Sequence, residues 1–113
     1  MTGHLTVLTT TDSREAALAL ARSPVEARVA ACAQADGPVT SVYRWEGEIR
    51  TDEEWRVLFK TPAARYEAPE AHLRAAHAYD TPEIIAADIT HGSDAYLTWL
   101  ATETTSTAGP LSD

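Results

Sequence analysis

The stretch Thr40–Thr61, TSVYRWEGEIRTDEEWRVLFKT, decides the fold that we expect for this chain. Its two arms are rich in β-branched and aromatic residues, which favour the pleated surface of a sheet. Glu46 and Gly47 separate the arms, and glycine readily adopts the positive φ that a two-residue hairpin turn requires. The sequence therefore predicts two long antiparallel strands joined at Glu46-Gly47.

Alternation along the second arm predicts which side chains share a face of the sheet. Trp55, Val57 and Phe59 fall on one side, whereas Glu54 and Lys60 fall on the other. Aromatic residues make up only 7% of the chain, yet this hairpin carries a large share of them. An isolated hairpin is barely stable in water, so other elements or another subunit must cover these side chains.

Elements on both sides of the hairpin complete a β-α-β-β-α-β order. The patterns predict strands over 4–10 and 83–90, longer helices over 12–32 and 62–76, and a short helix over 95–103. Two β-α-β units of this kind fold into a four-stranded antiparallel sheet with two helices on one face. We therefore expect an α+β, ferredoxin-like sandwich with an extra C-terminal helix.

Each of the two longer predicted helices contains a proline that is expected to disturb its geometry. An apolar stripe that includes Leu18 predicts a first helix over Asp12–Cys32, with Asp12 at its cap. Pro24 falls inside this range, so the pattern is typical either of one kinked helix or of two abutting helices. Thr61-Pro62 predicts the start of the second helix, which Pro69 is expected to kink.

The length of 113 residues predicts one domain, over residues 1–103, followed by a disordered tail over 104–113. Apolar side chains are expected on both faces of the sheet, although two helices cover only one face. Self-association would cover the other face. The net charge of −8 argues against nucleic acid as a partner. No apolar run reaches the ~20 residues of a membrane span, so we expect no membrane partner.

Five blocks of sequence carry a family resemblance. They are EARVAAC at 26–32, SVYRWEG at 41–47, EWRVLFKT at 54–61, HAYDTPEI at 77–84 and YLTW at 96–99. In this order they resemble the CutA family, the divalent-cation tolerance proteins, over roughly residues 5–101. The resemblance implies a ferredoxin-like fold, a tight homotrimer similar to the PII-type signalling proteins, a cytoplasmic location and a role in tolerance of copper and other divalent ions.

The chain departs from the family where a metal site is concerned. Ala78 stands where the family usually has proline, so the loop after His77 is expected to be less rigid. Some relatives carry a cysteine and a second histidine that are proposed as copper ligands, and here Thr9 and Ala76 stand at those positions. His77 alone remains of that set.

Two side chains are candidate ligands for copper or another divalent cation. His77 precedes Asp80 and Glu83, and imidazole with carboxylate suits divalent ions. Cys32 offers a thiolate to soft copper. The alternatives are a histidine at a helix end, where the helix dipole favours it, and a free cysteine buried as a small apolar residue.

A further set of residues is assigned to the trimer interface or to a cleft between subunits. For the aromatic members the alternatives are a ligand pocket and the core of the interface. For Lys60 and Glu54 they are an anion-binding cleft and an ion pair between subunits. The set comprises Tyr43, Trp45, Glu54, Lys60, Tyr79, Glu83, Tyr96 and Trp99.

The sequence contains no nucleophile elbow, glycine-rich phosphate loop, paired-cysteine zinc motif or basic patch, so we expect no enzymatic activity. Two hypotheses for function remain. The first is a non-enzymatic homotrimer that responds to and confers tolerance of divalent metal ions, with copper as the candidate ion. The second is a PII-like signalling module that binds a small metabolite or a partner protein at intersubunit clefts.

Overall fold

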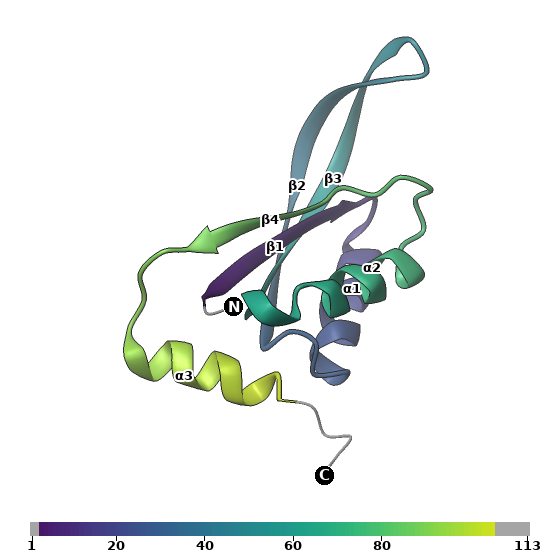
Figure 1. Cartoon of the computed structure of the whole chain (residues 1–113). Helices are drawn as coiled ribbons and strands as arrows, with labels where there is room; N and C mark the ends of the chain where they lie inside the picture. Colours follow the sequence, from purple (N-terminus) through teal and green to yellow (C-terminus); the bar gives the residue numbers. More distant parts are fainter. Residues whose placement is uncertain (1–2, 106–113) are drawn as a thin grey trace.

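Four antiparallel strands form a single sheet in the order β2-β3-β1-β4 in the computed structural model, which describes residues 3–105. The strands are β1 (His4–Thr11), β2 (Cys32–Trp45), β3 (Glu48–Pro62) and β4 (Ile84–Ile89). The helices are α1 (Arg14–Glu26), α2 (Glu67–Ala76) and α3 (Asp94–Glu103), with a short 3-10 helix η1 (Ala63–Arg65) before α2. Figure 1 shows α1 and α2 side by side on one face of the sheet. The predicted α+β fold with a ferredoxin-like strand order is confirmed.

The predicted hairpin is the longest feature of the sheet and projects beyond the other two strands (Figure 1). Trp45 pairs with Glu48 across the turn, and Cys32 pairs with Lys60 at the far end of the ladder. The turn lies at Glu46-Gly47 as predicted, and both residues have positive φ, 51° and 82°. Positive φ at both central positions is the geometry whose twist matches that of the flanking strands.

The core lies between the sheet and the pair α1 and α2. Val57 and Phe59 of β3 are fully buried, as is Val7 of β1, which pairs with Phe59. Leu20 of α1 and Leu73 of α2 pack into the same cluster. The alternation predicted for β3 is therefore confirmed, with Trp55, Val57 and Phe59 on the side of the helices. The opposite side of the sheet is called the open face below.

Strand β2 is interrupted at Gly37, where its register against β3 shifts between Asp36 and Val39. Gly37 has a φ of +155°, and a β carbon built there would lie 2.6 Å from Cδ1 of Trp55. The backbone of β2 thus lies directly against the indole ring, and only glycine leaves room for it.

We expect Gly37→Ala to lower the free energy of unfolding by about 1–3 kcal/mol, because the new methyl group overlaps the Trp55 ring. Urea denaturation would measure the loss. Trp55→Leu combined with Gly37→Ala is the control, since a smaller side chain at position 55 should make the two losses less than additive. Strict additivity of the two losses would contradict this account.

Helix α1 differs from its prediction at both ends. Ser13, not Asp12, caps it, and the Ser13 hydroxyl accepts a hydrogen bond from the Ala16 N–H at 3.0 Å. The helix ends at Glu26, and Arg28 adopts a left-handed φ of 62° just beyond it. The prediction of a helix as far as Cys32 was therefore wrong, because Cys32 begins β2.

The prediction that Leu18 lies on the buried stripe of α1 was wrong. Leu18 is 45% exposed, whereas Ala17, Leu20 and Pro24 are buried. Pro24 lies in the last turn of a continuous helix. The alternative of two abutting helices is therefore excluded.

Helix α2 begins later than predicted, because Pro62 is the last residue of β3 and not the first of a helix. Residues 63–65 form η1, and α2 starts at Glu67. Pro69 is the third residue of α2, where a backbone N–H would have no acceptor within the helix. It is accommodated in the first turn for that reason and does not divide the helix.

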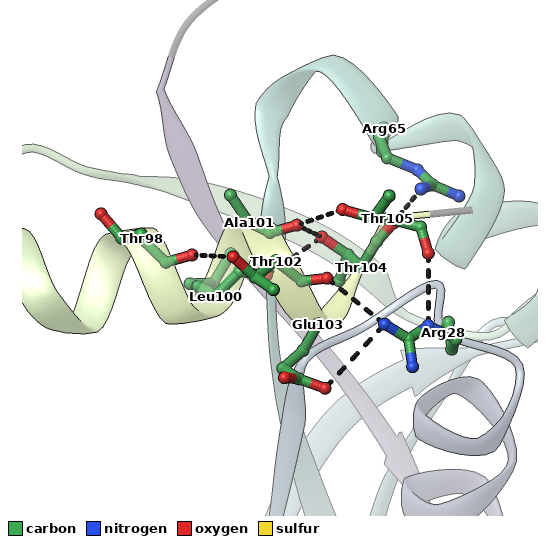
Figure 2. Close-up of polar contacts among 9 residues, drawn as sticks. All are labelled: Arg28, Arg65, Thr98, Leu100, Ala101, Thr102, Glu103, Thr104 and Thr105. Carbon is green, nitrogen blue, oxygen red and sulfur yellow. Dashed lines mark hydrogen bonds and ion pairs between the residues drawn. The ribbon is translucent and has the colours of Figure 1, made fainter. Parts of the chain in front are cut away.

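Two arginines bind the C-terminal end of α3 (Figure 2). Arg28 donates from Nη2 to the carbonyl of Thr102 at 3.3 Å and from Nε to the carbonyl of Thr105 at 3.2 Å. Arg65 donates to the carbonyl of Thr104, which is fully buried. Thr104 and Thr105, the first two residues of the predicted tail, are thus bound by Arg65 and Arg28. Residues 106–113 lie outside the described part of the chain.

Candidate functional site

A pocket of about 560 Å³ lies between the hairpin and the loop that joins α2 to β4. One wall belongs to the hairpin and consists of Ser41, Tyr43, Trp45, Arg50 and Glu54. These residues share the open face because side chains alternate along each strand and Tyr43 pairs directly with Arg50. We call them the hairpin wall. Val42 and Thr10 also contribute to the lining.

The second wall belongs to the loop before β4 and consists of Tyr79, Asp80, Thr81 and Glu83. We call it the loop wall. The hydroxyl of Tyr79 donates to Oε2 of Glu54 at 3.0 Å and so connects the two walls. Burial raises the pKa of Tyr79 well above its usual range, and the hydrogen bond to Glu54 raises it further. The phenol therefore stays protonated and remains the donor in this bond.

His77 fixes the loop wall against the sheet. Its Nε2 lies 2.8 Å from the carbonyl oxygen of Thr10, and its Nδ1 accepts a hydrogen bond from the Tyr79 N–H at 3.1 Å. A carbonyl oxygen only accepts, so Nε2 carries the proton and Nδ1 provides the lone pair. Both ring nitrogens are thereby occupied, and His77 has no free nitrogen for a metal ion in this arrangement.

We expect His77→Ala to lower the free energy of unfolding by about 1–3 kcal/mol, because it leaves a backbone carbonyl and a backbone N–H without partners. Thermal and urea unfolding would measure the loss. His91→Ala is the matched control, because within residues 3–105 the His91 ring hydrogen-bonds just the hydroxyl of its neighbour Thr90. A similar loss for both variants would contradict the proposed role of His77.

The pocket carries charges of both signs. Arg50 lies on the hairpin wall, and Asp80 and Glu83 lie on the loop wall. Among residues 3–105, none of these three side chains forms an ion pair. The hydroxyl of Tyr43 donates a hydrogen bond to the carboxylate of Asp52, which is not part of the pocket lining. The pocket therefore offers an exposed cation, two exposed carboxylates and aromatic surfaces.

A second polar cluster lies at the other end of the open face, next to α3. The hydroxyl of Tyr96 lies 3.5 Å from Sγ of Cys32, and Lys60 Nζ lies 5.9 Å from the centre of the Tyr96 ring. Lys60 also donates to Oε1 of Gln34 at 3.1 Å. The contact with Cys32, with burial as a lesser cause, raises the pKa of Tyr96 to about 12. The centre of the Trp99 ring lies 5.5 Å from the centre of the Tyr96 ring.

The residues predicted for an interface or cleft thus fall into two separate groups. Tyr43, Trp45, Glu54, Tyr79 and Glu83 line the pocket, while Lys60, Tyr96 and Trp99 gather beside α3. The single aromatic pocket considered from the sequence does not form within one chain. Glu54 and Lys60 share a face, as predicted, but they have different partners.

Sequence reasoning missed part of the hairpin wall, above all Arg50 and Ser41. The signal for Arg50 was present, because counting back from a two-residue turn at Glu46-Gly47 pairs position 50 with Tyr43. Thr10 and Thr81 carried no such signal, since their place depends on how the loop wall meets β1.

The two candidate metal ligands lie apart. Cys32 pairs with Lys60 of β3, and Lys60 in turn pairs with Thr6 of β1. His77 contacts the carbonyl of Thr10, which lies four residues further along β1 than Thr6. Within residues 3–105, no three His, Cys, Asp or Glu side chains come together as a group that could hold a metal ion.

In the described part of the chain, no helix combines the length and apolar character that crossing a membrane requires.

The model of the CutA1 divalent ion tolerance protein family matches residues 5–103. The chain belongs to the CutA1 family. This result confirms the resemblance carried by the sequence blocks between residues 26 and 99, and the match includes both walls of the pocket.

Curated relatives agree with this assignment. The chain is 40% identical over 98 residues to the divalent-cation tolerance protein CutA of Thermus thermophilus, a match that covers 87% of this chain and 95% of that protein. It is 42% identical over 100 residues to the chloroplastic protein CutA of Arabidopsis thaliana, covering 88% of this chain but only 55% of that protein. This CutA1-family chain therefore spans about half the length of the plant relative.

A solved structure of CutA from Xylella fastidiosa has the same fold. The two chains superpose with a TM-score of 0.88 at 35% identity, covering 91% of this chain and 99% of the other. The α+β fold of this CutA1-family chain is thus shared with its relatives over nearly the whole described length.

Proposed function

We propose that this CutA1-family chain is a non-enzymatic homotrimer that takes part in the response to and tolerance of divalent metal ions. Family membership supports the role, and the open face supports the assembly. Ile85 is 54% exposed on this face, and Tyr96 and Trp99 are 40% and 41% exposed. Large apolar side chains gathered on one face favour a covering surface, and a closed ring of identical subunits supplies one.

Light scattering of the purified chain tests the assembly. Three copies of a 12.2 kDa chain give a mass of about 37 kDa. A mass of about 12 kDa at all concentrations would overturn the proposed trimer, and a dimer would overturn its threefold symmetry.

Binding of copper or another divalent cation belongs to the assembly in this proposal, because one chain brings no three ligands together within residues 3–105. We expect calorimetric titration with Cu(II) to show binding that is lost when the trimer is broken. His77→Ala should leave it unchanged, since both ring nitrogens of His77 are occupied. Cys32→Ser tests the thiolate, which stays a candidate ligand. Copper binding by a monomeric variant at undiminished affinity would contradict a shared site.

A cytoplasmic location is proposed on one observation. Cys32 is the only cysteine, so no disulfide forms within the chain, and disulfide-free domains are typical of reducing compartments. The Arabidopsis relative is named as chloroplastic. Cell fractionation of the source organism would test this proposal, with the chain expected in the cytoplasmic fraction.

The pocket favours a second candidate function, the binding of a small metabolite as in a PII-like signalling module. Arg50, Asp80 and Glu83 of its lining form no ion pair among residues 3–105, and its volume of about 560 Å³ lies in the range of small-molecule sites. A thermal-shift screen tests this function, because a ligand that binds only the folded state raises the melting temperature. Stabilisation by a metabolite without stabilisation by metals would favour it over the first function.

A further inference from the structure

A second pocket, of about 260 Å³, lies on the helix side of the sheet. Most of its lining is apolar and consists of Leu20 of α1 and four alanines. Two of the alanines belong to α1 and two lie at or just after the end of α2: Ala16, Ala19, Ala76 and Ala78. Both helices lie on the side of the sheet opposite the open face (Figure 1), which is the face that the proposed trimer covers. We call this cavity the helix-side pocket.

The lining of the helix-side pocket carries no charge. Besides the four alanines and Leu20 it contains Thr11 and Ser23, so every lining side chain is uncharged, although the chain as a whole has a net charge of −8. A charged ligand would give up hydration there without meeting a counterion. An aliphatic group, in contrast, is removed from water by contact with the alanine methyl groups and Leu20. The lining therefore favours an uncharged, largely aliphatic ligand.

Thr11 contributes an unsatisfied polar group to the lining. The residue is 1% exposed, and its Oγ1 has no hydrogen-bond partner within residues 3–105. The other hydroxyl of the lining, that of Ser23, lies 2.6 Å from Nε2 of His72. A buried hydroxyl without a partner destabilises the folded state. Because no hydrogen bond fixes the Thr11 hydroxyl, rotation about χ1 can turn it toward the pocket, where a ligand oxygen would be its partner.

We propose that the helix-side pocket binds a small uncharged molecule with a branched aliphatic body and one oxygen, which is the chemistry of a short-chain alcohol or ketone. The oxygen pairs with the Thr11 hydroxyl, and the aliphatic body packs against Leu20 and the alanines. A volume of about 260 Å³ is below the range of drug-sized sites, so the ligand has few heavy atoms. The inference goes beyond the proposed functions, which depend on the open face, and its failure leaves them intact.

Three probes with the same branched body and different end groups test the proposal by NMR titration of the purified full chain. 3-Methyl-1-butanol is uncharged, 3-methylbutylammonium carries a positive charge and 3-methylbutanoate carries a negative charge. We expect the alcohol to bind with a Kd of about 1 mM, in keeping with its small size, and both ions to bind at least about tenfold more weakly. Changes in amide chemical shift should be centred on Ala19, Ala76 and Ala78.

An isosteric exchange tests the hydroxyl. Thr11→Val keeps the shape of the side chain and should weaken binding of the alcohol about tenfold. Thr9→Val is the matched control, because Thr9 is also buried on the same face of β1 and its Oγ1 also has no partner within residues 3–105, but it does not line the pocket. It should leave binding unchanged. Both variants should raise the melting temperature of the ligand-free protein, because each removes an unsatisfied buried hydroxyl.

A second pair of variants tests the location of the ligand. Ala76→Leu places a larger side chain in the pocket and should abolish binding of 3-methyl-1-butanol. Ala75→Leu is its control, because Ala75 is the neighbouring exposed residue of α2 and is not part of the lining. That variant should bind the alcohol like the unchanged chain. Thermal unfolding of all four variants establishes that each is folded.

Several results would overturn the inference. They are the absence of saturable binding of 3-methyl-1-butanol up to about 50 mM, equal binding of the alcohol and either ion, and undiminished binding by Thr11→Val or by Ala76→Leu. Shift changes centred on the open face would also overturn it. A lower melting temperature of ligand-free Thr11→Val would do the same, because it would show that the hydroxyl already has a partner within the chain.

Discussion

Phe59→Ala is expected to lower the free energy of unfolding by about 3–5 kcal/mol, the range for removal of a fully buried aromatic side chain. Phe59 has no exposed surface and lies at the centre of the cluster that Leu20 of α1 and Leu73 of α2 form with the sheet. Its removal leaves a cavity where both helices meet β3. Urea unfolding at fixed protein concentration, followed by far-UV circular dichroism, would measure the loss.

Two variants serve as controls for Phe59→Ala. Phe59→Leu keeps most of the buried volume and should cost clearly less than the alanine variant. Val42→Ala removes an apolar side chain that is 67% exposed on the same hairpin, so its effect on the isolated subunit should be within about 0.5 kcal/mol. A loss below about 1 kcal/mol for Phe59→Ala would show that the core is not centred on this residue.

Ile85→Asp is expected to convert the trimer into monomers. Ile85 lies on the open face, where Leu8 is its partner in β1, and it is 54% exposed in the single chain. An aspartate there costs the isolated subunit little, but an interface that covers it would bury an unpaired charge at a cost of several kcal/mol. Light scattering should fall from about 37 kDa to about 12 kDa, the mass of one 12.2 kDa chain.

Leu18→Asp is the matched control for Ile85→Asp. Leu18 is 45% exposed on α1, which lies on the opposite side of the sheet (Figure 1). The same exchange at that position should leave the trimer intact. A trimer that survives Ile85→Asp, or one that breaks equally with either variant, would contradict an assembly through the open face.

The hairpin and the strand order were predictable because local rules determine them. A glycine between two β-rich arms defines the turn, and alternation from that turn assigns Val57 and Phe59 to the buried face. The number of strands and their order then follow from the β-α-β-β-α-β pattern.

The helix boundaries were less predictable because tertiary contacts determine them. Residues 27–32 have a helical composition, yet Arg28 adopts a left-handed conformation there and its side chain reaches the end of α3. Arginine has no intrinsic preference for that conformation, so no local signal placed the end of α1 at Glu26. Pro62 likewise stays in β3 because its partner His4 extends the ladder to that position.

The candidate site was predicted as a list of residues and not as an arrangement. Alternation along β3 predicted that Glu54 and Lys60 share a face. It could not predict that they belong to different clusters, because Glu54 binds Tyr79 of the loop before β4 and Lys60 lies near Tyr96 of α3. The hydrogen bond that occupies Nε2 of His77 is to the carbonyl of Thr10, which lies 67 residues away in the chain. Contacts of such range are fixed by the packing of whole elements.

The position of β1 between β3 and β4 has a consequence for synthesis on the ribosome. The strand is made first, but both of its neighbours follow later in the chain, and the second of them ends only at Ile89. The β2–β3 hairpin, closed by a two-residue turn, has local partners and can pair as soon as it emerges. The nascent chain thus exposes one unpaired edge of its first strand until β4 has been synthesised, and a ribosome stalled before residue 84 would display that edge to the cell.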